Sequence, residues 1–172
     1  MGGADKALLS LRGEPLLAHV VARFAPQVER LAISANGDAA RFGGFGLPVL
    51  PDDTSRGPLS GVLAALHWAD GADAVVSVPV DCPFLPGDLA PRLLMAGLPA
   101  MASSGGHDHP VFAIWPVALR APLQAFLASG AKARVTDFLA AQGVARADFP
   151  DDGAFANINT PADLLAAAVR LT

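Results

Sequence analysis

One run of residues constrains the fold of this chain more than any other. Residues 74–80, AVVSVPV, are almost entirely apolar on both faces of an extended chain, and the run ends at Asp81. A strand that is apolar on both faces is typical of the centre of a parallel sheet covered by helices on each side. Elsewhere the hydrophobic positions alternate between helical and extended periods, which predicts an α/β domain with a mostly parallel sheet.

The same periodicity predicts a series of short elements. Pro15 and Pro26 bracket a helix over residues 16–24, Gly57 and Pro58 open a second helix, and Thr160 caps the last one. Further helices are expected at residues 86–97, 117–128 and 135–142, and strands at residues 31–35, 48–50, 74–80 and 144–149, with two more between residues 99 and 115 joined by a loop.

Composition excludes several classes of protein. The 172 residues suffice for one domain with a substantial core. Although 52% of them are hydrophobic, the apolar runs fall short of the roughly 18–20 residues that a bilayer requires, and no secretory signal pattern is present, so we expect a cytoplasmic protein without a membrane partner. The net charge is −4 and the basic residues are scattered, which argues against nucleic acid as a partner.

Polar residues that directly follow strands are the best candidates for chemistry, because ligands of open α/β sheets bind at the carboxyl ends of the strands. Asp81 follows the apolar strand, where its carboxylate suits magnesium or, equally, a turn or helix cap. Asp52 and Asp53 follow a shorter strand, and a structural turn is favoured there. Asn36 could bind a base or ribose, but the sequence Asn-Gly also favours a turn.

The local sequence also indicates a role for three other residues. Lys6 follows a glycine pair and could neutralise a phosphate, although such a signal alone favours a solvated lysine. His109 precedes Pro110 and is interpreted as a loop residue near a ligand, since no set of ligands for a transition metal surrounds it. Cys82 is the single cysteine, and we expect a small buried residue beside Asp81.

Taken together, the motifs resemble the family of molybdenum cofactor guanylyltransferases, within the wider nucleotidyltransferases. The resemblance covers nearly the whole chain. It is carried, in this order, by MGGADKALLSLRGEPLLAHV, LAISANGD, GLPVLPDD, GPLSGVLAAL, VPVDCPFLP, HDHPVFAIW and FANINTPADL.

This resemblance implies a Rossmann-like, three-layer α/β/α fold and the transfer of GMP from GTP to the phosphate of molybdopterin, with release of pyrophosphate. By their positions in the motifs, Lys6 and Asp81 would be catalytic, and Asp81 would hold Mg²⁺. The nucleotide would contact Lys6, Asn36, Asp52, Gly57 and Asp81. His109, Asn157 and Asn159 would lie on the acceptor side.

The chain is expected to form one domain, with the nucleotide-binding part at about residues 1–85 and the acceptor part at about residues 86–172. Molybdoenzymes or their chaperones are candidate protein partners. Two other functions remain open: a cytidylyltransferase or sugar-phosphate relative, which would share Lys6 and Asp81, and a module that binds the cofactor without catalysis.

The chain departs from the family at one point. The family begins with a strand and a loop, LAGGxSxRMGG, whereas this sequence starts at the methionine of that loop. We expect Met1 to be an internal methionine of a longer protein. As written, the chain would lack the first strand and several phosphate-binding groups, so we expect two unpaired strand edges and impaired transfer.

Overall fold

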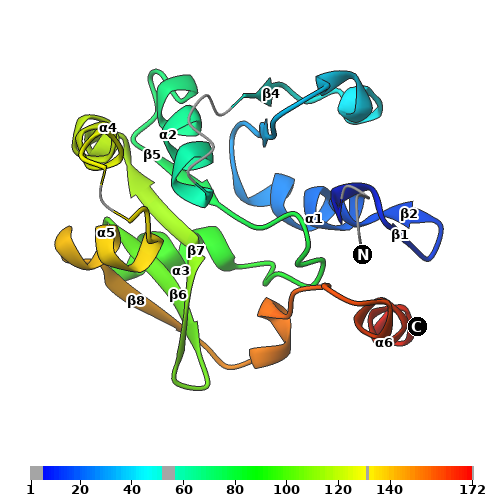
Figure 1. The fold of residues 1–172 in the computed structure, drawn as a ribbon. Helices are drawn as coiled ribbons and strands as arrows, with labels where there is room; N and C mark the ends of the chain where they lie inside the picture. The colour runs from blue at the N-terminus through cyan, green and yellow to red at the C-terminus, as the bar shows by residue number, and fades with distance from the viewer. Residues whose placement is uncertain (1–5, 52–56, 131, 172) are drawn as a thin grey trace.

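The computed structural model describes residues 6–51, 57–130 and 132–171 (Figure 1). Its helices are α1 Leu16–Phe24, α2 Pro58–Trp68, α3 Leu89–Ala96, α4 Arg120–Ala128, α5 Val135–Ala141 and α6 Pro161–Arg170. Its strands are β1 Ser10–Leu11, β2 Glu14–Pro15, β3 Ile33–Ser34, β4 Val49–Leu50, β5 Ala74–Ser77, β6 Ala100–Ser104, β7 His107–Pro116 and β8 Ala145–Phe149. Short 3₁₀ helices include η1 Lys6–Leu8, η3 Ala39–Phe45 and η5 Asp152–Phe155.

The main sheet is mixed, which corrects the expectation of a mostly parallel one. Its strand order is β5-β7-β6-β8, and only β6 and β8 run parallel within it. The strands β6 and β7 form a hairpin, so β7 runs antiparallel to β6 and also to β5 on its other side. A second sheet joins β3 and β4 in parallel, and β1 pairs with β2 in an antiparallel ribbon.

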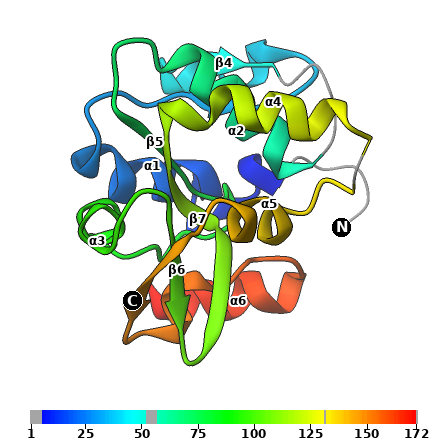
Figure 2. The same ribbon diagram turned by 90° about the vertical axis from the view of Figure 1, so that its left-hand side faces the viewer.

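Helices cover both faces of the main sheet, as the expected three-layer architecture requires. On one face, α2, α4 and α5 pack around the fully buried Trp115 of β7. On the other face, α1, α3 and η5 pack against β6 and Ile114. In Figure 2, α2 and α4 lie at the top of the molecule and α6 at the bottom. The α/β fold class is therefore confirmed.

Local sequence signals explain where several helices begin. Helix α1 begins directly after Pro15 and buries Leu16, Leu17, Val20 and Phe24, as its periodicity predicts. Helix α6 begins after Thr160, with Pro161 in the first helical position. Within the described residues, no helix is long and apolar enough to cross a membrane.

A cavity of about 860 Å³ is lined on one side by β3 and on another by β5. Apolar side chains from α1, α2 and both strands line much of it, including Val20, Ala65 and Val76. Among the described residues, β3 pairs only with β4 and β5 pairs only with β7, so each presents one unpaired edge. Strand β5 is therefore an edge strand of its sheet rather than the central parallel strand expected from the sequence.

Candidate active site

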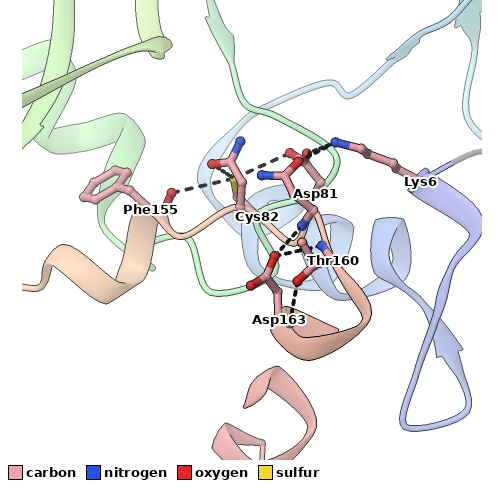
Figure 3. Close-up of polar contacts among 8 residues, drawn as sticks. Lys6, Asp81, Cys82, Phe155, Thr160 and Asp163 are labelled. Atoms are coloured by element: carbon pink, nitrogen blue, oxygen red, sulfur yellow. Dashed lines mark hydrogen bonds and ion pairs between the residues drawn. The ribbon is translucent and has the colours of Figure 1, made fainter. Parts of the chain in front are cut away.

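The candidate site is built around Asp81, which lies in the turn that follows β5. Asp81 is buried, with 9% of its surface exposed, and its carboxylate Oδ2 lies 3.5 Å from the ammonium of Lys6 (Figure 3). Lys6 lies in η1, near the N-terminus. One partner of this ion pair is thus shielded from water, whereas the Lys6 side chain is 44% exposed.

The segment that precedes α6 supplies the third side of the site. Asn159 Oδ1 accepts a short hydrogen bond from the Lys6 ammonium. Ile158 is buried, and its backbone N–H donates to the carbonyl of Asp81 over 2.9 Å. Because side chains alternate along an extended chain, burial of Ile158 places Asn157 and Asn159 on the opposite side from it.

The buried Cys82 connects the turn that contains Asp81 to the segment that precedes α6. Its thiol is fully buried and donates to Asn157 Oδ1 over 3.2 Å, with Asp81 Oδ1 at 3.7 Å. Burial, with a further contribution from the Asp81 charge, strongly raises the pKa of the Cys82 thiol. The thiol therefore remains a protonated donor at neutral pH, and the sequence expectation of a small buried residue beside Asp81 is confirmed.

A capping box fixes the start of α6 beside the site. The carboxylate of Asp163 accepts from the backbone N–H groups of Asn159, at 2.9 Å, and Thr160, at 2.8 Å. In return, Thr160 Oγ1 accepts from the N–H of Asp163. These bonds, first the one from Asn159, lower the pKa of Asp163.

Two predicted nucleotide-binding residues, Asn36 just after β3 and Gly57 just before α2, line the cavity between β3 and β5. The lining of this cavity extends to Val80, the residue before Asp81. Gly57 has φ 71° and ψ −157°, a conformation that favours glycine, and it leads into Pro58 at the start of α2. Asp52 lies outside the described residues.

His109 lies within strand β7, which corrects the loop position expected from the sequence, and it contacts Ser104, Phe112 and Phe155. Its Nε2 lies 2.7 Å from Ser104 Oγ, and its ring stacks on Phe155 at 4.3 Å between centroids. Burial lowers the pKa of His109. The carbonyl of Phe155 also accepts from the Cys82 thiol, so two residues, Phe155 and Cys82, connect His109 to Asp81.

The structure thus brings Lys6 into contact with both Asp81 and Asn159, and the Cys82 thiol connects Asn157 to Asp81. Sequence reasoning did not single out Asp163 or the bonding role of Cys82. For Asp163 a signal was present, since Thr160 and Asp163 have the spacing of a capping box. The contact between Cys82 and Asn157 joins residues 75 positions apart, which no local pattern reports.

No group of three or more metal-ligating residues occurs within the part of the chain that the structure describes. Magnesium does not require one, because it keeps several waters and is commonly held by one or two carboxylates together with substrate phosphates. The carboxylate of Asp81 would suit such shared coordination, and the ammonium of Lys6 lies 3.5 Å from it.

The three-layer α/β fold, with Lys6 of η1 beside Asp81 in the turn after β5, agrees with the class of nucleotidyltransferases, to which the comparisons with known proteins assign the chain. A model of the MobA-like NTP transferase domain matches residues 1–145. A molybdenum cofactor guanylyltransferase from Cereibacter sphaeroides is 60% identical over 168 residues, which cover 95% of this chain and 86% of that protein. Another from Bradyrhizobium sp. (strain ORS 278) is 47% identical over 184 residues, covering 99% and 86%. The chain therefore belongs to the MobA-like NTP transferases and, within them, to the molybdenum cofactor guanylyltransferase family.

Solved structures agree with the fold. Molybdopterin-guanine dinucleotide biosynthesis protein A from Archaeoglobus fulgidus superposes with a TM-score of 0.74 at 19% identity, covering 98% of this chain and 91% of that one. A 4-diphosphocytidyl-2C-methyl-D-erythritol synthase from Anaerococcus prevotii gives a TM-score of 0.79 at 12% identity, covering 98% and 92%. At such identities the likeness shows the nucleotidyltransferase fold alone.

Proposed function

We propose that this protein transfers GMP from GTP to the phosphate of molybdopterin in the molybdenum cofactor, forming a guanine dinucleotide and pyrophosphate. The observation that carries the proposal is the contact of Lys6 with both Asp81 and Asn159. It joins a phosphate-binding cation, a metal-binding carboxylate and a predicted acceptor-side amide in one cluster. Membership of the guanylyltransferase family supports the choice of nucleotide and acceptor.

The reaction balances without a protein nucleophile. An oxygen of the acceptor phosphate attacks the α-phosphorus of GTP, the bond from that phosphorus to the bridging oxygen breaks, and pyrophosphate leaves with the electron pair. Both reactants are anionic, so the ammonium of Lys6 would reduce their repulsion and stabilise charge on the leaving group.

In this proposal Asp81 would hold Mg²⁺ jointly with the phosphates. When bound, the ion would neutralise phosphate charge and help to orient the triphosphate. The other residues then divide by position. Asn36, Asp52 and Gly57 would bind the nucleotide, with the start of α2 near the ligand, and His109, Asn157 and Asn159 would face the pterin. Molybdoenzymes or their chaperones would receive the product.

The test is a transfer assay with molybdenum cofactor, Mg²⁺ and a panel of GTP, CTP and ATP. We expect guanine dinucleotide and pyrophosphate with GTP, and loss of both products in Asp81→Asn, which removes the carboxylate charge at nearly constant size. A product formed from CTP instead would make the protein a cytidylyltransferase. Binding of the cofactor without magnesium-dependent binding of GTP would replace the proposal with a non-catalytic module.

A further inference from the structure

The capping box of α6 makes one bond more than helix capping needs. In a capping box the side chain at the third helical position bonds the N–H of the cap residue, here Thr160. Asp163 Oδ2 bonds that group at 2.8 Å but also bonds the N–H of Asn159 at 2.9 Å. Asn159 precedes the helix, so this second bond ties the helix to the residue outside it.

Asn159 is also the residue that binds the Lys6 side chain. Asn159 Oδ1 accepts from the Lys6 ammonium, which also lies 3.5 Å from Asp81 Oδ2. Figure 3 shows Asp163 beside Thr160 and Lys6 beside Asp81, and the hydrogen bonds of Asn159 connect the two pairs. The residue before it, buried Ile158, donates its backbone N–H to the carbonyl of Asp81, so the backbone of Asn159 is held on both sides.

We infer that Asp163 is a positioning residue for Lys6. Its carboxylate fixes the backbone of Asn159, and the Asn159 amide oxygen in turn fixes the ammonium beside Asp81. The inference rests on the proposed function for its catalytic meaning. Its structural content, the dependence of Lys6 on Asp163, does not require that function.

A matched pair of variants separates this role from ordinary capping. Asp163→Ala removes the bonds to both Asn159 and Thr160. Thr160→Ala removes a capping bond of the same box but leaves the carboxylate on Asn159. Both variants weaken the start of α6, so both should lower the melting temperature by similar amounts. Asp163→Glu serves as the rescue, because glutamate is a preferred residue at this position of a capping box.

The first readout follows Lys6 directly and needs no substrate. The chain has two lysines, Lys6 and the exposed Lys132, which is the internal control. Under brief acetylation followed by peptide mass spectrometry, Asp163→Ala should raise the labelling rate of Lys6 by about two- to tenfold, the range that one hydrogen bond contributes. Thr160→Ala and Asp163→Glu should leave that rate near the wild-type value, and Lys132 should not respond in any variant.

The second readout is the transfer assay with GTP. We expect kcat/KM for GTP to fall about two- to tenfold in Asp163→Ala, and to stay near wild type in Thr160→Ala and Asp163→Glu. Equal Lys6 labelling in Asp163→Ala and Thr160→Ala would overturn the inference and leave a structural cap. Faster Lys6 labelling in Asp163→Ala alone, in a chain that transfers no nucleotide from GTP, would uphold the positioning role and reject the proposed function.

Discussion

The ammonium of Lys6 lies 3.5 Å from Asp81 Oδ2, although the two residues are 75 positions apart in the sequence. The Lys6 side chain is 44% exposed and that of Asp81 is 12% exposed. An ion pair with one partner so accessible adds little to stability, because water screens it and the lysine loses side-chain entropy. A reason for placing these groups together is therefore better sought in ligand binding than in folding.

Replacing Lys6 with alanine tests that conclusion. We expect kcat/KM for guanylyl transfer to fall by about 10²- to 10³-fold, the usual cost of losing one group that stabilises transition-state charge. The free energy of unfolding should change by less than about 1 kcal/mol. Steady-state kinetics and urea denaturation measure the two effects. A variant that loses stability and keeps its activity would show that the pair is structural.

Much of the fold could be predicted because the signals are local. The prolines around α1, the cap at Thr160 and the apolar run before Asp81 each act within a few residues, and the corresponding elements are present. The direction of β7 could not be predicted from its own sequence. It depends on which strand the hairpin returns beside, and that is decided by packing between distant segments.

The candidate site was predictable in part for the same reason. Asp81 could be found because it ends a strand, and Lys6 and Asn159 were assigned through family motifs rather than through their spacing. Their contact spans 153 positions, and periodicity carries no information over such a distance. The contacts that connect Asp163 to Lys6 could be identified only in the structure, even though the capping box itself has a sequence signature.

Gly57 offers a test of the backbone at the start of α2. Its φ of 71° and ψ of −157° lie in a region that residues with a Cβ avoid, so Gly57→Ala should lower the free energy of unfolding by about 1–3 kcal/mol. Gly43 is the control, because it lacks a positive φ and an added Cβ would meet no atom within 4 Å. Chemical denaturation of both variants provides the measurement, and equal losses would contradict the role assigned to Gly57.

The cavity between β3 and β5 predicts binding of a dye that recognises apolar surfaces. Its volume of about 860 Å³ and its apolar lining should give the native chain strong fluorescence with ANS. Ala65 of α2 lines the cavity, so Ala65→Glu, which adds bulk and repels the sulfonate of the dye, should reduce the signal. Ala125→Glu, at an exposed position of α4, should not. If both variants bind the dye as the wild type does, the dye occupies another surface.

Cys82 predicts how stability changes at alkaline pH. The folded chain holds the thiol protonated, because burial and then the charge of Asp81 raise its pKa, whereas an unfolded cysteine ionises near pH 8.5. Above that pH the unfolded state binds fewer protons than the folded state, so the free energy of unfolding should fall by about 1.4 kcal/mol per pH unit. The chain has no tyrosine, so the window from about pH 8.5 to 10 serves to follow this group. Denaturation across this window should show the slope in the wild type and lose it in Cys82→Ser, whose hydroxyl can still donate to Asn157 but does not ionise there. An equal slope in both proteins would mean that another group is responsible and that the thiol is not held protonated.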